Sequence, residues 1–297
     1  MINPLKKITQ ALRRSLGGSA ERDPAMKLLI DMQRRLKRIE GQQETLNKIW
    51  LRTRHLEPAV QAILRELHFD RDWLEYPEKL TAQRFRLASQ NQEDGITLAL
   101  LKVIGTTNRR FVEIGSGLSG GNSAFLAREC GWTGLMVDGD AAHMQQVGRR
   151  FPGVTAVSAW VTRENINPLL QENGVAGEVD LFSLDLDGND YWIWEAMSAC
   201  SPRLMIVEYN SMFGPERSVT VPYDPEFDRR KYRFTYYGAS LSAWVKLAAR
   251  KEYRLVAVEP TGVNAFFLRN DVGSEVPACE PGRAYRLLEK YCVFRPS

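Results

Sequence analysis

The stretch Phe111-Val-Glu-Ile-Gly-Ser-Gly-Leu-Ser-Gly-Gly-Asn122 decides the fold of this chain. An apolar, β-prone run enters a glycine-rich turn, and a helical pattern follows over Asn122–Cys130. Gly115, Gly117 and Gly120 have the G-x-G-x-x-G spacing of a chain that turns tightly beneath a ligand. A plain strand-to-helix turn has the same pattern, so the residues around it decide its meaning.

Working outward, short β-rich runs alternate with helical patterns from about residue 76 onward. The runs are Phe111–Gly115, Gly134–Asp138, Val154–Val161, Val179–Asp185, Leu204–Glu208, Arg254–Val258 and Ala265–Arg269, with helical patterns at Ala141–Phe151 and Leu241–Lys251. Alternation of this kind predicts a parallel sheet covered on both faces. The last two runs are joined by a connection too short for a parallel crossover, so they must pair antiparallel. We predict an α/β, Rossmann-like, seven-stranded sheet with an antiparallel C-terminal hairpin.

An acid ends the second strand. Asp138 lies 21 residues beyond Gly117, where a carboxylate can accept both hydroxyls of a ribose at the carboxyl edge of the sheet. The turn and the acid together predict an adenosine-containing ligand. Glu113, inside the first strand, would repel a pyrophosphate, and the closing hairpin is unusual for dinucleotide-binding sheets. We therefore favour S-adenosylmethionine, and an NAD(P)-dependent oxidoreductase is the alternative.

A second acidic group follows the fourth strand. Asp185 and Asp187 share one face of an extended chain, and the fifth strand ends at Glu208 and Asn210 on the same sheet edge. One aspartate could act as the general base, and Asp185 or Asp187 is the candidate catalytic residue. Alternatively, Asp185, Glu208 and Asn210 could hold Mg²⁺, which prefers oxygen ligands. A solvated acidic turn that caps the next helix is the third interpretation.

Taken together, Glu113-x-Gly115-x-Gly117, Asp138 and the hairpin resemble class I S-adenosylmethionine-dependent methyltransferases over residues 76–297. The Asp185-x-Asp187-Gly188 element is faintly similar to FkbM-type methyltransferases, and the acids of the fourth and fifth strands resemble metal-dependent catechol-type enzymes. The resemblance implies O-methylation of a hydroxyl on a glycan, sugar or related small molecule. A catalytically inactive scaffold with this fold is the remaining alternative.

The same resemblance implies roles for the residues around the turn. Glu113 would order the loop beside the methionine amine, and Asp138 would hold the ribose. Trp160 follows the third strand, where adenine is commonly bound, and we expect it to stack on the base. The residues that would flank the cofactor are Gly115, Ser116, Gly117 and Gly120.

The segment 211–240 has no clear periodicity and is long for a connection in a compact domain, which is typical of a functional lid. Its arginines and tyrosines suit a sugar or an acidic substrate. The candidate substrate-binding residues are Asn210, Arg217, Tyr223 and Tyr237. A merely structural surface loop is the alternative.

Two segments precede the α/β domain. Residues 1–23 form a basic amphipathic stretch, and residues 1–20 suit peripheral contact with an anionic membrane surface, a solvated tail or a transit peptide. Residues 24–75 are predicted to be helical. Within residues 24–53 a heptad seam predicts a homo-oligomeric coiled coil, or else an amphipathic helix packed on its own domain. The seam residues are Leu29, Met32, Leu36, Ile39, Gln43, Leu46 and Trp50.

Charge and composition exclude several classes of protein. The net charge is +4, but residues 1–40 carry ten Lys and Arg against four Asp and Glu, so the remainder sums to −2. A slightly acidic main domain argues against a nucleic-acid substrate. No run of about 18 apolar residues is present. The four cysteines form no C-x-x-C pair, so we expect a reducing, cytoplasmic location and no zinc site.

Overall fold

The computed structural model describes residues 24–53, 60, 63, 74–232 and 235–288. It divides into two compact units, Met1–Glu57 and Pro58–Ser297, which are considered separately. The basic stretch at residues 1–23 lies outside the described residues, so its predicted membrane contact stays a prediction. The predicted boundary between residues 75 and 76 follows a segment that is mostly outside them, and it also stays a prediction.

The larger unit is built on one seven-stranded sheet with the order β3-β2-β1-β4-β5-β7-β6. Its strands are β1 (Arg110–Ile114), β2 (Thr133–Asp138), β3 (Val154–Ser158), β4 (Gly177–Leu184), β5 (Cys200–Glu208), β6 (Tyr253–Val258) and β7 (Asn264–Arg269). β1 to β5 pair in parallel, whereas β7 runs antiparallel to both β5 and β6. The predicted Rossmann-like sheet and its antiparallel hairpin are therefore confirmed.

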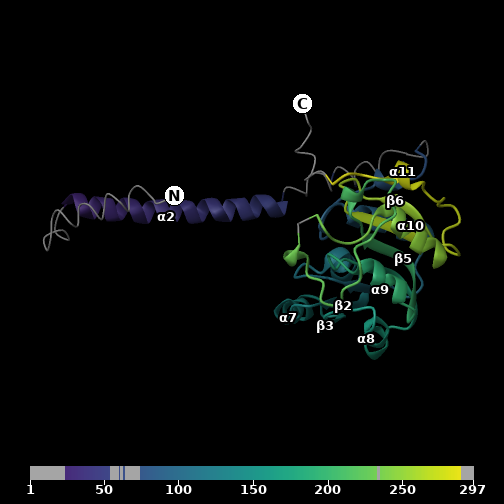
Figure 1. The fold of residues 1–297 in the computed structure, drawn as a ribbon. Helices are drawn as coiled ribbons and strands as arrows, with labels where there is room; N and C mark the ends of the chain where they lie inside the picture. The colour runs from purple at the N-terminus through teal and green to yellow at the C-terminus, as the bar shows by residue number, and fades with distance from the viewer. Residues whose placement is uncertain (1–23, 54–59, 61–62, 64–73, 233–234, 289–297) are drawn as a thin grey trace. The chain divides into compact units, whose positions relative to one another are not determined.

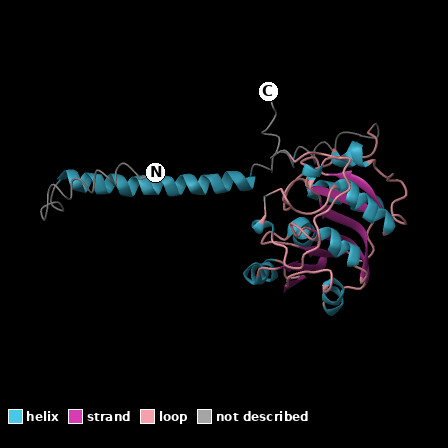
Figure 2. Cartoon of the chain, in the orientation of Figure 1, coloured by secondary structure: helices cyan, strands magenta, loops and turns pink. Residues whose placement is uncertain are grey.

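Helices cover both faces of the sheet, because alternate strand residues point to opposite sides (Figures 1 and 2). Val112 and Ile114 of β1 belong to one buried cluster, and Phe111 belongs to the other. The first cluster includes residues of α8 (Ile166–Glu172), α9 (Asp190–Ala196) and α10 (Leu241–Arg250). The second includes residues of α5 (Glu93–Ile104), α6 (Ala124–Glu129) and α7 (Ala141–Arg150). The remaining short helices are α4 (Glu78–Thr81), α11 (Pro281–Ala284), η2 (Gly121–Ser123), η3 (Ser211–Phe213) and η4 (Arg229–Lys231).

Side-chain caps fix where two of these helices begin. Asp140 accepts hydrogen bonds from the backbone N–H groups of Ala142 and His143, which starts α7 directly after the loop that follows β2. Ser240 accepts one from the N–H of Ala243 and starts α10, the helix that follows segment 211–240. Both caps lie beside the carboxyl edge of the sheet, so the connections above that edge are anchored at their ends.

The smaller unit contains one long described helix, α2 (Pro24–Thr53), labelled in Figure 1. The predicted helix over residues 24–53 is thus confirmed. None of the helices among the described residues has both the length and the apolar character needed to cross a bilayer.

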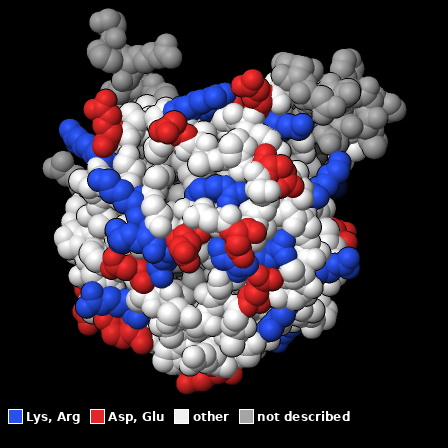
Figure 3. Space-filling model, turned by 90° about the vertical axis from the view of Figure 1, so that its right-hand side faces the viewer, with Lys and Arg blue, Asp and Glu red and all other residues white. Residues whose placement is uncertain are grey.

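The distribution of charge on one face of the larger unit is relevant to whether it binds nucleic acid. On the face in Figure 3, Lys and Arg side chains are interspersed with Asp and Glu. A surface that binds a phosphate backbone would instead carry a continuous basic stripe. This face, as far as its residues are described, has no such stripe.

Candidate functional site

A cavity of about 1140 Å³ opens at the carboxyl edge of the parallel strands. Ligands of open α/β sheets bind at this edge, because the loops that leave the strands diverge there. The cavity is lined by Gln90, Asn91, Gly115, Gly117, Asp138, Gly139, Asp140, Ala141, Trp160, Asp185, Leu186, Asp187, Glu208, Arg229, Arg230, Tyr237, Thr261, Val263 and Leu288. Its volume exceeds the usual range for one small ligand, so it has room for two reactants.

The glycine-rich turn forms one wall of this cavity. Gly115 has φ +82°, and a Cβ placed there would collide with the backbone carbonyl of Asp185. Glycine at 115 therefore lets the ends of β1 and β4 approach each other. Gly117 has φ +54°, and a Cβ there would meet no atom within 4 Å, so the turn leaves open space at this point.

Glu113 holds the turn from below. Its buried carboxylate accepts hydrogen bonds from the N–H of Asn122 at 3.2 Å and from the N–H and hydroxyl of Ser123 at 2.9 and 2.6 Å. Burial raises the pKa of this carboxyl to about 7, although the same hydrogen bonds work in the opposite direction. Glu113 thus occupies the backbone donors at the start of η2 and α6, and it does not line the cavity.

Asp138 joins two loops at the end of β2. One carboxylate oxygen accepts from the N–H of Gly117 at 2.9 Å, and the other accepts from the N–H of Asp140 at 2.9 Å. Each oxygen keeps a further lone pair for a ligand. Asp138 lines the cavity, so its predicted position beside a bound ligand agrees with the structure.

Trp160 lies across from the loop that follows β2. Its indole N–H donates to the carbonyl of Pro225 at 2.8 Å, and its ring lies 3.3 Å from where a Cβ of Gly139 would be. The ring is more than half exposed and lines the cavity. A planar base could stack on it, as the sequence predicts.

Not every residue predicted to bind the cofactor reaches the cavity. Gly115, Gly117, Asp138 and Trp160 line it, whereas Glu113, Ser116 and Gly120 do not. The Ser116 hydroxyl lies near the sulfur of Met144, and a Cβ at Gly120 would contact the ring of Phe151. These three residues shape the turn from behind; Glu113 orders the loop as the sequence analysis expects, and contact of Ser116 and Gly120 with a cofactor stays a prediction.

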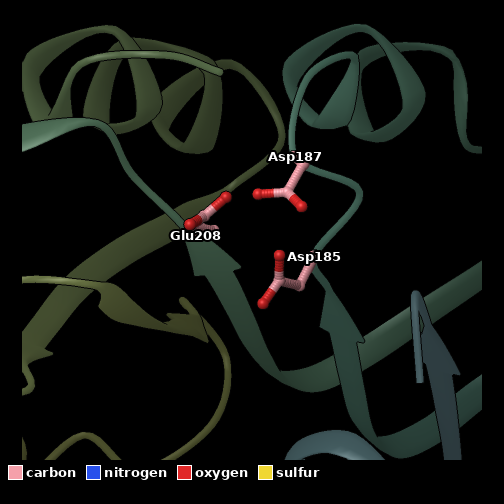
Figure 4. A group of neighbouring side chains, drawn as sticks. All are labelled: Asp185, Asp187 and Glu208. Carbon is pink, nitrogen blue, oxygen red and sulfur yellow. The ribbon is translucent and has the colours of Figure 1, made fainter. Parts of the chain in front are cut away.

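Three carboxylates meet above the ends of β4 and β5. Asp185, Asp187 and Glu208 each offer an oxygen, and these oxygens all lie within 4.8 Å of one another. Figure 4 shows the three side chains facing a common space. The carbonyl of Glu208 accepts from the indole N–H of Trp244 at 3.0 Å, which anchors the end of β5 to α10. The predicted convergence of these three acids is confirmed.

Asp190 shapes the loop that presents this group. Its buried carboxylate accepts from the N–H of Leu186 at 2.6 Å and from the N–H of Gly188 at 2.9 Å. Between them Asp187 takes φ +57°, a left-handed conformation that is uncommon for a residue with a side chain. Burial raises the pKa of Asp190 to about 6. Asp190 therefore has a structural role at the start of α9.

Asp185 and Glu208 differ from the other buried acids in one respect. Glu208 is only 9% exposed and Asp185 is partly exposed, and no described residue donates a hydrogen bond to either carboxylate; both side chains line the cavity. Elsewhere buried carboxylates are well supplied with donors: Asp94 accepts from three backbone N–H groups, and Asp180 accepts from three others. Carboxylates this little exposed need donors or a cation, so whatever fills the cavity, solvent or ligand, must supply them.

Burial and mutual repulsion perturb this pair strongly. The pKa of Asp185 is raised well above its usual value, first by burial and then by the charges of Asp190 and Asp187. The pKa of Glu208 is raised in the same way, by burial and then by Asp185 and Asp187. Groups of this kind take up a proton more readily than ordinary carboxylates, and a bound cation would relieve their repulsion.

Asn210 does not join the carboxylates, although the sequence predicts that it does. Its buried amide N–H₂ group donates to the carbonyls of Thr235 at 2.8 Å and Tyr237 at 2.9 Å, and its oxygen accepts from the N–H of Met212 at 3.0 Å. The side chain ties the start of segment 211–240 to its end, and Asn210 is neither among the residues that line the cavity nor in the group of acids. The prediction that Asn210 binds substrate or metal is therefore wrong, and Asp187 takes that place beside Asp185 and Glu208.

Segment 211–240 contributes residues to the cavity wall, but most of them are not the residues predicted to bind substrate. Tyr237 lines the cavity, whereas Arg217 and Tyr223 do not. The hydroxyl of Tyr223 instead bonds to Glu164, and the guanidinium of Arg163 lies over its ring at 4.0 Å. Arg217 is exposed. The placement of Arg217 and Tyr223 at a substrate site thus finds no support in the structure.

Arg229 belongs to the arginines of segment 211–240 noted in the sequence, but it is not among the predicted site residues. Its guanidinium forms an ion pair with Asp187 and lies over the ring of Tyr237 at 3.8 Å. Arg230 lines the cavity beside it. Its only sequence signal is a pair of arginines in the long loop after the strand that ends in the acids. Neighbouring residues do not distinguish this pair from two arginines exposed to solvent.

No family model and no curated protein match the sequence. The fold is similar to several solved structures. The O-methyltransferase from Bacillus cereus, in complex with S-adenosylhomocysteine, is 16% identical with a TM-score of 0.39, covering 71% of this chain and 96% of that one. A putative O-methyltransferase from Klebsiella pneumoniae is 17% identical with a TM-score of 0.38, covering 71% and 94%.

A third similar structure has a different description. It is a TehB-like S-adenosylmethionine-dependent methyltransferase from Corynebacterium glutamicum, 11% identical with a TM-score of 0.37, covering 58% of this chain and 86% of that one. All three solved structures to which this chain is similar are thus described as methyltransferases.

Proposed function

We propose that this chain is an S-adenosylmethionine-dependent methyltransferase that acts on a hydroxyl group. The observation that carries the proposal is the pair Asp185 and Glu208, which line the cavity without a donor from any described residue, beside a wall that suits a nucleoside. Gly117, Asp138 and Trp160 form that wall. A ribose would meet the carboxylate of Asp138, and an adenine would meet the ring of Trp160.

Glu113 supports this cofactor over a dinucleotide. A pyrophosphate binds at the start of a helix by accepting from its free backbone N–H groups. Here the N–H groups of Asn122 and Ser123 already donate to Glu113. A pyrophosphate would have to compete with a buried carboxylate for them, whereas an uncharged ribose beside Asp138 does not. This argument disfavours the NAD(P)-dependent oxidoreductase.

S-adenosylmethionine supplies a sulfonium methyl group that is transferred by in-line displacement. The task of the chain is therefore to place a hydroxyl oxygen in line with the methyl group, exclude water and receive the hydroxyl proton. Asp185 and Asp187 lie at the cavity wall where such a proton would be released. The pKa of Asp185 is raised above its usual value, which makes it a stronger base, and we assign this task to Asp185, with Asp187 as the second candidate.

Mg²⁺ fits the same three acids. It prefers carboxylate oxygens, and Asp185, Asp187 and Glu208 offer three within one small space. A cation there would satisfy the two carboxylates that lack donors, and it would lower the pKa of a bound hydroxyl. As the alternative to a base at Asp185, we propose Asp185, Asp187 and Glu208 as ligands of Mg²⁺, in place of the set with Asn210.

The acceptor that fits this site best is a polyhydroxylated molecule such as a sugar or glycan. The cavity lining offers the amides of Gln90 and Asn91 and the guanidinium of Arg230. Amides, guanidinium groups and carboxylates bond to neighbouring hydroxyls of a sugar. We propose a small-molecule or glycan acceptor on this ground.

Ligand binding separates the two cofactor classes. We expect S-adenosylmethionine and S-adenosylhomocysteine to raise the unfolding temperature of the full chain and NAD and NADP to leave it unchanged. Stabilisation by NAD or NADP alone would overturn the proposal.

Turnover then tests the acids. With labelled S-adenosylmethionine and a panel of sugars, Asp185→Asn should lower methyl transfer at least 100-fold while S-adenosylhomocysteine binds as before. Glu172→Gln, at an exposed acid on α8, is the matched control. Full activity of Asp185→Asn would refute the assignment of the base. Loss of activity on adding a chelator, with recovery on adding Mg²⁺, would support the metal site.

A further inference from the structure

The helix α2 carries a row of exposed apolar side chains. Among the described side chains of its seam, the exposed fractions are 47% for Met32, 39% for Leu36, 57% for Ile39, 64% for Leu46 and 59% for Trp50. Single exposed apolar residues are ordinary, but a continuous stripe of them marks an interaction surface. The stripe belongs to the smaller unit and is separate from the cavity of the larger one.

The spacing of the stripe specifies what covers it. Its members alternate by three and four residues, which is the heptad pattern of helices that wind around each other. Leu36, Gln43 and Trp50 occupy a positions, and Met32, Ile39 and Leu46 occupy d positions. The surface is therefore shaped for another helix with the same period.

The stripe is also narrow. Apart from Leu28 and Ile49 near its ends, the flanking e and g positions are polar, namely Gln33, Arg35, Glu40, Gln42 and Asn47. A strict a and d stripe is the narrow seam of a coiled coil, whereas a helix packed in the core of a globular domain also carries apolar e or g residues. The surface thus suits a coiled-coil partner.

The charged residues beside the seam favour a parallel pairing of α2 with α2 of a second copy of this chain. In a parallel pair each g residue lies beside the e residue five positions later on the other helix. Arg35 then lies beside Glu40 of the second copy, and the pair occurs twice by symmetry. Arg35 pairs with Asp31 of its own helix in the single chain, but its side chain is 77% exposed and can reach a second acid.

Gln43 specifies the register. In a parallel, unstaggered pair the two Gln43 side chains meet in one layer and can hydrogen-bond to each other. A shift by one heptad would bury each amide against Leu36 or Trp50 with no partner, which is unfavourable. The same residue that interrupts the apolar seam therefore selects one alignment.

We propose that α2 forms a parallel, in-register, two-stranded coiled coil with α2 of a second copy of this chain. The inference concerns the smaller unit only and does not depend on the proposed reaction. It assigns Arg35 and Glu40 to ion pairs between the copies, and Gln43 to a polar layer that sets their alignment.

Sedimentation of the full chain tests the association. At tens of micromolar we expect a mass near twice the 33.8 kDa of one chain. Ile39→Glu, which places a charge in the seam, should reduce this mass to that of a single chain. Thr45→Glu, which adds the same charge on the outward face, should leave it doubled. A wild-type mass of one, three or four chains, or no change with Ile39→Glu, would overturn the proposal.

Two further measurements test orientation and pairing. Met32→Cys should form a disulfide between copies under mild oxidation, because d residues meet in a parallel pair, and outward-facing Arg34→Cys should not. Met32 near one end would be far from its counterpart in an antiparallel pair, so absence of this cross-link overturns the parallel arrangement. Glu40→Arg should weaken the dimer several-fold and added Arg35→Glu should restore it; failure of the restoration overturns the assigned ion pairs.

Discussion

Replacing Gly115 by alanine tests the close approach between the glycine turn and the carboxylate loop. Gly115 has φ +82°, and a new Cβ would collide with the backbone carbonyl of Asp185. The left-handed conformation costs about 1–2 kcal/mol for a residue with a side chain. Separating the two loops to make room costs about 1–3 kcal/mol more. We therefore expect Gly115→Ala to lower the free energy of unfolding by about 2–5 kcal/mol.

A matched glycine separates the two contributions. Gly174, exposed after the end of α8, has φ +70°, but a Cβ there would meet no atom within 4 Å. Gly174→Ala should therefore cost only the conformational part, about 1–2 kcal/mol. Urea unfolding followed by circular dichroism measures both variants against the wild type.

The same substitution has a second consequence at the site. Asp185 follows β4 directly, so a displaced carbonyl moves the carboxylate as well, and a shift near 1 Å can lower a rate about 100-fold. Calorimetry with S-adenosylhomocysteine and a methyl-transfer assay would detect this. If Gly115→Ala and Gly174→Ala lower the free energy of unfolding by the same amount, the close approach of β1 and β4 is refuted.

Three further predictions concern the acids and the tryptophan. The folded-state pKa of Glu113 is raised from 4.5 to about 7, so its contribution to stability is fully present below pH 4.5 and is lost as pH rises through about 7. Between pH 4.5 and 8 wild type should lose about 3 kcal/mol more unfolding free energy than Glu113→Gln, and parallel pH profiles would contradict this. Glu208→Gln removes one of the like charges around Asp185, so it should raise the unfolding temperature by about 2–4 °C without divalent cations. The same substitution should abolish stabilisation by Mg²⁺. A lowered unfolding temperature would show that Glu208 is already well partnered. Trp160→Ala should weaken the binding of S-adenosylhomocysteine about 2- to 12-fold in calorimetry, and Trp160→Phe should bind it nearly as well as wild type. An unchanged affinity of Trp160→Ala would show that Trp160 is not part of the binding site.

The strands and the turn could be predicted because their causes are local. Apolar alternation and glycine spacing specify β1, the turn and α6 within a dozen residues, and the short connection between β6 and β7 leaves only antiparallel pairing. The meeting of Asp185, Asp187 and Glu208 also follows from sequence, because parallel strands end at one edge.

Asn210 and Arg229 show where prediction from sequence ends. The amide of Asn210 is consumed by the carbonyls of Thr235 and Tyr237, which lie 25 and 27 residues later in the chain. The guanidinium of Arg229 pairs with Asp187, 42 residues earlier. Neither contact has a periodic pattern behind it, since segment 211–240 is held by side-chain hydrogen bonds and not by repeating backbone geometry.

The sequence by itself thus determined the sheet, its closing hairpin, the glycine turn and the edge at which the acids gather. Only the tertiary structure decided which polar side chains there are already satisfied and which are not. The side chains of Glu113 and Asn210 form their hydrogen bonds with other residues of the protein, whereas Asp185 and Glu208 face the cavity without donors from the described residues. The physical reason is that hydrogen-bond satisfaction depends on partners brought together by folding, and these are distant in the chain.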